Sequence, residues 1–490
     1  MTLKKLQNFK GTSADAIYLT FVRVLTAISS IICIKIVSVE FSLDEYGTYA
    51  QAILISTTLT SLLILGMADG VNYFFNRGKD SEGNKASYIS TIFALQIFLG
   101  ILGGILILAA SPKLTEYFDN VQLKPLYLWI AFQPLLTNLL AMYQNLYISI
   151  GKARLIVARN LVLSIARIGI FCVAGFFTKS IFTIVSACFI FDLAQTLYFT
   201  INLRRFGVKI KPSDADIKKV RSILGYCIPM ATFVFMNALL RDMDKWIVGL
   251  LGNTEELAIY TNASKVLPFD MLTISYATIL IPVVTRLIGN SQQQVAKIYG
   301  EYLNLSFITT SILVCPAIIY SKDLLVTLYS EKYLAGLYVF IIYLVVDLIR
   351  FANVSLLFSA TAKTKALIGI SIITLVCNAI LAIPFYYIFG ITGPAMASLL
   401  AIMLSYTLFI YGGSKILNCS LFKLFNYKQI ARLFFEIFIC AGIGLFIYSR
   451  VEIASPILEF IIFYSFTVLI LAALSRKEIL AYIRNLNAIR

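Results

Sequence analysis

Residues 241–246, RDMDKW, place four charges in an otherwise apolar segment. At 100° per residue on a helix, Arg241, Asp244 and Lys245 fall within about 100° of arc, and Asp242 flanks them. A charge at mid-membrane costs about 2.5–3.5 kcal/mol on insertion scales, so such residues face a helix bundle or a wet cavity. This balanced cluster could bind an anion, or it could hold neighbouring helices together as a neutral staple.

Other cations recur at middle depths of apolar segments in both halves of the chain. Arginine suits bidentate contact with phosphate, so these cations predict a cavity that attracts a diphosphate. The predicted substrate-binding residues are Arg23, Arg167, Arg241, Lys245, Lys265 and Arg350. The candidates for ion pairing or for coupling to an ion are Asp242, Asp244 and Asp270.

The sequence predicts neither a catalytic set nor a metal site. It has no histidine, which removes the commonest acid/base residue and metal ligand. Its 8 cysteines show no CxxC spacing and therefore predict no zinc site and no disulfide framework. No organic cofactor is expected, and coupling to H⁺ or Na⁺ is left open.

The elements that must position these charges are membrane-spanning helices. The chain has 490 residues, of which 59% are apolar and only 13% charged, whereas a soluble domain is about a quarter charged. A span needs about 20 mostly apolar residues. Such windows lie at 14–39, 46–75, 86–110, 124–148, 155–177, 180–203, 223–250, 257–288, 295–320, 336–360, 366–389, 392–414, 429–448 and 456–474. The predicted fold is an all-α polytopic membrane protein with about 14 transmembrane helices.

The net charge of +16 reflects topology rather than nucleic-acid binding. Most of the 41 Lys and Arg residues fall in the loops that share a side with both termini. The opposite side holds only Lys113, Lys124, Lys179, Lys322, Lys332 and Arg450. By the positive-inside rule both termini are cytoplasmic and the number of spans is even.

Two pairs of segments match at one offset, which predicts an internal duplication. SLDEYGTYAQA begins at Ser42 and NTEELAIYTNA begins 211 residues later at Asn253. The same offset aligns Lys152 with Lys363. Since 211 residues cover six spans, an even number, the copies form a parallel repeat.

This repeat predicts four regions along the chain. Residues 1–203 form an N-terminal six-helix lobe, and 204–222 form a basic cytoplasmic linker. Residues 223–415 form the second six-helix lobe. Residues 416–490 hold two extra transmembrane helices and an amphipathic cytoplasmic tail, RKEILAYIRNLNAIR.

DKWIVGLLGNTEELAIYTNASKV, from Asp244, resembles the signature of the polysaccharide flippases in the multidrug/oligosaccharidyl-lipid/polysaccharide (MOP) transporter superfamily. LDEYGTYAQA, GITGPAMAS and LIPVVTRL resemble further segments of that family. The resemblance covers about residues 14–415 and is diffuse, while the two closing spans are similar to those of the fourteen-span lipid II flippases.

The resemblance implies two six-helix lobes around a cavity that opens alternately to each side. In Wzx-type members the cargo is an oligosaccharide on undecaprenyl diphosphate, such as an O-antigen or capsule repeat unit, moved from the cytoplasmic to the outer leaflet of the bacterial cytoplasmic (inner) membrane. The implied partners are this lipid-linked glycan and membrane lipid, with polysaccharide polymerase and chain-length proteins as further candidates. No nucleic-acid partner is expected.

Three other interpretations stay open. A multidrug exporter or a lipid II flippase of the same fold would share the architecture, although an exporter of cationic drugs should have an acidic lining. A membrane-embedded glycan polymerase or transferase is the alternative from another class. Its members typically carry a long outer loop with catalytic acids, whereas the outer loops here are short.

Overall fold

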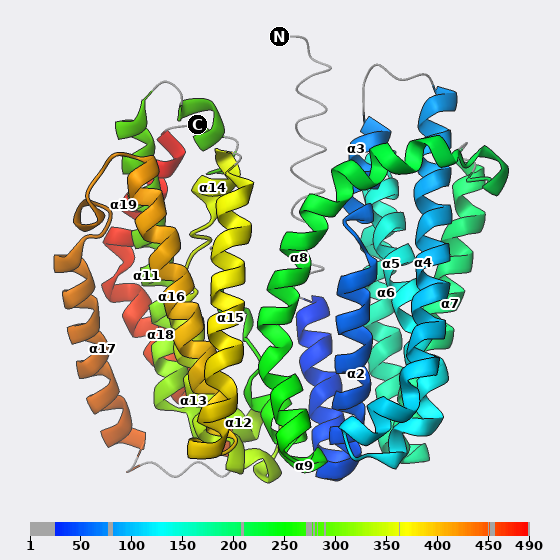
Figure 1. Ribbon diagram of the computed structural model, residues 1–490. Helices are drawn as coiled ribbons and strands as arrows, with labels where there is room; N and C mark the ends of the chain where they lie inside the picture. The colour runs from blue at the N-terminus through cyan, green and yellow to red at the C-terminus, as the bar shows by residue number, and fades with distance from the viewer. Residues whose placement is uncertain are drawn as a thin grey trace. The chain divides into compact units, whose positions relative to one another are not determined.

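The computed structural model describes residues 25–76, 82–206, 210–270, 277, 280–281, 283–288, 291–361, 363–448, 450 and 456–488. In these ranges the chain forms helices, turns and irregular segments and contains no strand. The helices are long and roughly parallel within each part of the chain (Figure 1). The predicted all-α membrane fold is confirmed.

The chain divides into two compact units, residues 1–258 and 259–490. In the first unit residues 25–40 are helical. Its further helices are α2 (Leu43–Leu63), α3 (Met67–Asn76), α4 (Glu82–Tyr117), α5 (Tyr127–Ser149), α6 (Ala153–Cys172), α7 (Ile181–Arg205) and α8 (Ile217–Leu251), with short turns η1 (Val121–Leu126), η2 (Val173–Thr178) and η3 (Pro212–Asp214). The core of this unit joins α3, α4, α5, α7 and the first half of α8 through residues such as Phe74, Phe93, Tyr147, Phe199 and Ile223.

Helix α9 (Thr254–Ala263) crosses the boundary between the units. The second unit continues with η4 (Pro268–Asp270), α11 (Gln292–Ile319), α12 (Ser321–Leu328), η5 (Glu331–Gly336), α13 (Leu337–Ile349), α14 (Leu356–Ala360), α15 (Thr364–Phe389), α16 (Thr392–Ile416), η6 (Leu421–Lys423), α17 (Tyr427–Tyr448), α18 (Pro456–Leu474) and α19 (Arg476–Ala488). By packing, α8 belongs to the first unit. The predicted lobes are defined by the internal repeat and not by packing, so their boundaries stay predictions.

Eleven helices of the described chain are long and apolar enough to cross a membrane, and twelve if the bent helix α8 counts as one span. Two of the fourteen predicted windows, 14–39 and 257–288, run into residues outside the described ranges. The multi-pass character is therefore confirmed, while the count of fourteen stays a prediction.

The duplication is visible in the bounds of the helices. Adding the 211-residue offset to α7, Ile181–Arg205, gives the bounds of α16, Thr392–Ile416. The same offset takes the start of α6 to the start of α15, and the turn η1 to within a residue of η5. Element order thus repeats from α2 to α16, and the parallel orientation of the two copies stays a prediction.

The two acidic segments of the repeat are helix starts. Ser42 caps α2: its hydroxyl accepts the backbone N–H of Glu45 at 3.2 Å, and the Glu45 carboxylate accepts the N–H of Ser42 at 2.9 Å. In the second copy the Asn253 side chain accepts the N–H of Glu256 at 2.8 Å. Side-chain caps of this kind satisfy the free N–H groups of a first helical turn. In the first copy the Glu45 carboxylate therefore has a structural role.

The basic segments of the repeat are equivalent turns. The N–H of Lys152 donates to the carbonyl of Tyr147 at 2.8 Å, and the N–H of Lys363 donates to the carbonyl of Phe358 at 2.9 Å. Both hydrogen bonds join residues related by the 211-residue offset, and each lysine precedes a helix of its unit. The sequence match between these two segments therefore reflects a shared local structure.

The second unit contains a break that its counterpart lacks. Helix α13 ends at Ile349, and residues 351–355 are not helical. The hydroxyls of Tyr299 and Tyr406 donate to the carbonyls of Val354 and Ala352 at 3.2 and 2.9 Å, and the Tyr302 hydroxyl accepts the N–H of Asn353 at 2.8 Å. Irregular backbone at membrane depth needs such partners inside the protein.

The three closing helices pack on α11. Leu433, Ile437 and Leu471 of α17 and α18 share a core with Ile308 and Ile312 of α11. The amphipathic tail forms α19, whose Tyr482 hydroxyl donates to Gln429 at 2.6 Å and whose Asn485 amide donates to the buried Glu301 at 3.1 Å. The tail is therefore part of the second unit's fold.

Candidate functional site

Helix α8 carries the charged segment. Asp216 begins it by accepting the N–H of Lys218 at 2.9 Å, and Gly252 ends it. Its two halves, Ile217–Pro229 and Val234–Leu251, meet at an angle of 48°. Proline removes a hydrogen-bond donor from a helix, and Pro229 therefore accounts for a bend at this place. The charges lie on the second half.

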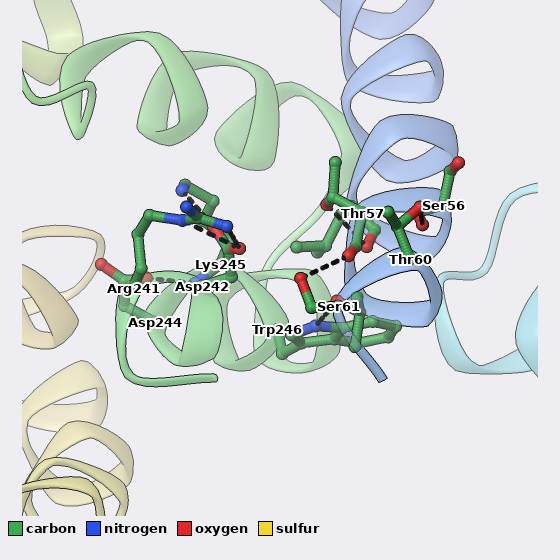
Figure 2. Close-up of polar contacts among 11 residues, drawn as sticks. Ser56, Thr57, Thr60, Ser61, Arg241, Asp242, Asp244, Lys245 and Trp246 are labelled. Carbon is green, nitrogen blue, oxygen red and sulfur yellow. Dashed lines mark hydrogen bonds and ion pairs between the residues drawn. The ribbon is translucent and has the colours of Figure 1, made fainter. Parts of the chain in front are cut away.

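Two cations converge on one carboxylate in this segment (Figure 2). Arg241 Nη2 lies 3.1 Å from Asp242 Oδ2, and Lys245 Nζ lies 2.8 Å from Asp242 Oδ1. The helical wheel puts Asp242 at the edge of the charged face, yet it is the shared partner. Long cationic side chains reach across this angle because they are flexible.

The three side chains differ in exposure. The side chain of Arg241 is 58% exposed, whereas those of Lys245 and Asp242 are 16% and 11% exposed. A guanidinium in a spanning helix cannot face hydrocarbon at this exposure without a large cost. We therefore expect Arg241 to face water, whereas Lys245 and Asp242 are less exposed.

Asp244 is fully buried, and one of its oxygens accepts the N–H of Lys245 at 2.8 Å. The next residue, Trp246, joins α8 to α2 through its indole N–H, which donates to the Thr58 hydroxyl at 3.1 Å. Tyr117 of α4 donates to the Trp246 carbonyl at 2.7 Å. These contacts fix the second half of α8 against two helices of its own unit.

The face of α2 beside Trp246 is rich in hydroxyls (Figure 2). Thr57, Thr60 and Ser61 donate to carbonyls of their own helix at 2.7–3.2 Å. Each hydroxyl keeps acceptor capacity after donating. Sequence reasoning missed this polar face and Trp246, although the run STTLTS within a span signals it.

The duplication provides an internal comparison for the charges. Subtracting 211 places Arg241, Asp242, Asp244 and Lys245 opposite Ser30, Ile31, Cys33 and Ile34, which lie on the helix of residues 25–40. The first copy thus folds with neutral residues at all four positions. Hence the repeated architecture does not require the charges, which favours a functional role over the staple.

A second polar cluster lies in the first unit. Asp192 of α7 is 4% exposed and accepts hydrogen bonds from Gln133 of α5 at 2.6 Å and from Gln195 at 3.0 Å. Arg159 of α6 donates to Gln195 at 2.9 Å. The predicted site residue Arg167, also on α6, is exposed and interacts electrostatically with Asp192. Gln133 and Gln195 form most of this network. The sequence did not predict their role, because neutral amides do not stand out in it.

In the second unit Lys265 and Arg350 lie at two chain irregularities. Lys265 follows α9 in the non-helical residues 265–267, and Arg350 ends α13. The N–H of Leu267 donates to the buried carboxylate of Asp347 at 3.1 Å, which ties the two irregularities together. Both cations are half-buried.

Two predicted site residues cannot be placed in full. Arg23 lies outside the described residues, and of Asp270 only the backbone, at the end of η4, is described. Of the remaining residues, the structure brings together Arg241, Asp242, Asp244 and Lys245. Whether the cations of both units share one cavity stays a prediction.

Known proteins support the same architecture. Residues 41–337, more than half of the chain, match the family model described as polysaccharide biosynthesis protein. No curated protein matches at the level of sequence.

Among solved structures, the lipid II flippase MurJ in an inward closed conformation superposes with a TM-score of 0.71 at 17% identity, covering 95% of this chain and 99% of MurJ. An inward-facing multidrug resistance transporter of the MATE family and the MOP superfamily gives a TM-score of 0.66 at 15% identity and covers 81% of this chain and 96% of its own. A MOP superfamily transporter from Pyrococcus furiosus gives 0.55 at 13% identity, with 82% and 95% covered. At these identities the matches show the fold alone, which is similar to that of the MOP transporters. The family match shows that the chain belongs to the polysaccharide biosynthesis protein family.

Proposed function

We propose that this protein is a flippase that moves an oligosaccharide linked to undecaprenyl diphosphate from the cytoplasmic to the outer leaflet by alternating access. Arg241 carries the proposal: it is a cation on a spanning helix with 58% of its side chain exposed, and Lys245 lies behind it. A guanidinium binds phosphate oxygens through two parallel hydrogen bonds, so this pair suits the diphosphate of the carrier.

The charge of the site argues against a cationic drug as cargo. The Arg241 guanidinium is the most exposed group of the α8 cluster, while both carboxylates are buried. A cation entering the wet space would meet this positive group first. The neutral residues Ser30 and Ile34 at the equivalent positions of the first copy further support a role of these cations beyond folding.

The extent of the structural matches also favours a lipid-linked cargo. The lipid II flippase covers 95% of the chain, including the closing helices, whereas the multidrug transporter covers 81%. Helices α17 and α18 pack on α11 and expose much of their apolar surface, with Phe438 77% exposed. We infer that this surface contacts lipid and borders the path of the isoprenoid chain. A lipid II flippase therefore stays the second candidate.

We place the protein in a bacterial cytoplasmic membrane with both termini in the cytoplasm. The distribution of Lys and Arg supports this orientation. Coupling to H⁺ or Na⁺ and association with a polysaccharide polymerase and chain-length proteins belong to the same proposal.

The decisive experiment removes the cation while keeping the charge balance. Arg241→Gln combined with Asp242→Asn should lower surface polysaccharide on the order of tenfold, with the lipid-linked oligosaccharide accumulating in the inner leaflet. Because Lys245 loses its partner Asp242 in this double variant, export is compared per amount of protein in the membrane. Arg205→Gln, at the exposed end of α7, is the matched control and should export normally.

Arg23→Gln, Arg167→Gln and Arg350→Gln extend the test to the other predicted contacts. Normal surface polysaccharide in the double variant and in these three single variants would end the cationic-site proposal.

A further inference from the structure

We propose that Asp242 is a built-in competitor of the cargo: its carboxylate occupies Arg241 and Lys245 in the empty protein and is displaced when a phosphate group of the cargo arrives. The inference rests on the proposed function and adds a residue that sets how tightly the cargo is held.

The contacts of Asp242 match those expected of a phosphate at this place. Each of its two oxygens accepts from a different cation, at 3.1 Å from Arg241 Nη2 and 2.8 Å from Lys245 Nζ. Arg241 Nε also points to the Oδ2 atom, at 3.3 Å. A carboxylate and a phosphate present similar oxygen pairs to a guanidinium. An incoming phosphate therefore competes for the same donors.

The exposure of the three groups allows this exchange. Arg241 is half-exposed, so cargo can reach its guanidinium without opening the helix packing. Arg241 also has a donor group, Nη1, that makes no hydrogen bond in the described residues. Contact can begin at Nη1 while Asp242 still holds the other edge, and displacement follows as the phosphate turns toward Lys245.

The fold does not need a carboxylate at this position. Ile31 stands at the equivalent position of the first copy, within an ordinary helix. Asp242 balances the charge of the two cations when the helix inserts into the membrane. Asp244, fully buried two residues away in the same segment, also contributes a negative charge. The second carboxylate, Asp242, contacts both Arg241 and Lys245 and is therefore available for the transport cycle.

A competitor is useful because a transport site must release what it binds. Two unopposed cations, of which Lys245 is largely buried, would hold a diphosphate strongly and slow its exit. Asp242 lowers the affinity by re-forming its two ion pairs when the cargo leaves. Selectivity follows as well, since a ligand with a single weak negative charge gains too little to displace the carboxylate.

The test measures binding and transport separately, with undecaprenyl diphosphate as the probe and the purified full chain in lipid nanodiscs. Asp242→Asn should bind the probe about tenfold more tightly than the parent protein and should export less polysaccharide per amount of protein in the membrane. Asp242→Glu keeps the charge and should restore parental affinity. Asp119→Asn makes the same change of charge at an exposed turn and should alter neither.

Should Asp242→Asn fold poorly, Lys245→Gln and Lys245→Gln with Asp242→Asn form a second comparison, in which the double variant should bind the probe more tightly than the single one. Unchanged affinity in both comparisons, with binding still weakened by Arg241→Gln, would overturn the competitor role and leave the proposed function standing. If Arg241→Gln and Lys245→Gln each leave binding unchanged, the proposed function itself fails.

Discussion

Lys245 Nζ and Asp242 Oδ1 lie 2.8 Å apart on successive turns of α8, and both side chains are largely buried. Removing one partner of a buried ion pair typically costs about 3–5 kcal/mol because the other charge is left unpaired. Lys245→Gln should therefore destabilise the protein more than Arg241→Gln, whose side chain is half-exposed. Thermal unfolding of the purified variants measures the difference.

Lys245→Gln combined with Asp242→Asn is the control for this prediction. If the loss comes from an unpaired charge, the double variant should regain much of the stability lost in the single one. A double variant as unstable as Lys245→Gln would show that the loss of stability comes from packing and not from the unpaired charge.

Gly47 of α2 closely approaches Thr254, the first residue of α9. A Cβ atom built there lies 2.1 Å from the carbonyl oxygen of Thr254, a distance that no real contact tolerates. Gly47→Ala should therefore lower the midpoint of thermal unfolding and the amount of protein in the membrane.

Gly169 of α6 provides the matched comparison, because a Cβ there meets nothing within 4 Å. Alanine gains about 0.5–1 kcal/mol over glycine inside a helix. Gly169→Ala should leave the midpoint unchanged or raise it. Equal behaviour of the two variants would contradict the packing described around Gly47.

The Tyr406 hydroxyl should contribute to stability through the break in the second unit. It donates to the Ala352 carbonyl at 2.9 Å, and Tyr406→Phe leaves that carbonyl without this partner. The expected loss is about 1 kcal/mol, visible as a lower unfolding midpoint. Tyr411→Phe, on an exposed position of the same helix, should have no such effect. A null result at Tyr406 would mean that water satisfies the carbonyl equally well.

The orientation in the membrane can be tested with single cysteines in a cysteine-free background. Lys322→Cys should react with an impermeant maleimide added to intact cells, whereas Lys211→Cys should react only after permeabilisation. Both positions are exposed on their own units, so accessibility reports the side of the membrane. The reverse pattern would show that the orientation predicted from the distribution of Lys and Arg is wrong.

Much of the architecture is predictable because long apolar segments and charged loops are sorted by lipid and water. This sorting does not depend on contacts between particular residues. The 211-residue offset between Ser42 and Asn253 also predicts where helices begin, since both residues are caps whose type reflects local hydrogen bonding. Such local signals can be recognised in the sequence without knowledge of the tertiary fold.

The site itself is only partly predictable. The charges of α8 stand out against apolar neighbours, but the choice of Asp242 as the shared partner depends on side-chain conformations that a helical wheel omits. The sequence did not predict a site role for Gln133 and Gln195, because neutral amides occur on helices of every kind. Their role depends on the carboxylate of Asp192, which only the tertiary structure brings within hydrogen-bond distance. The break after Arg350 was also missed, since residues 351–355 contain neither glycine nor proline.

That break makes the two copies of the repeat mechanically unequal. Helix α5 runs without interruption through residues 139–144, the positions equivalent to 350–355, so flexing it there would sacrifice several backbone hydrogen bonds. In the second copy the backbone of residues 352–354 instead forms hydrogen bonds with the hydroxyls of Tyr299, Tyr302 and Tyr406. We therefore expect bending at residues 350–355 to cost less than bending of α5 at residues 139–144, and Arg350 lies beside this break.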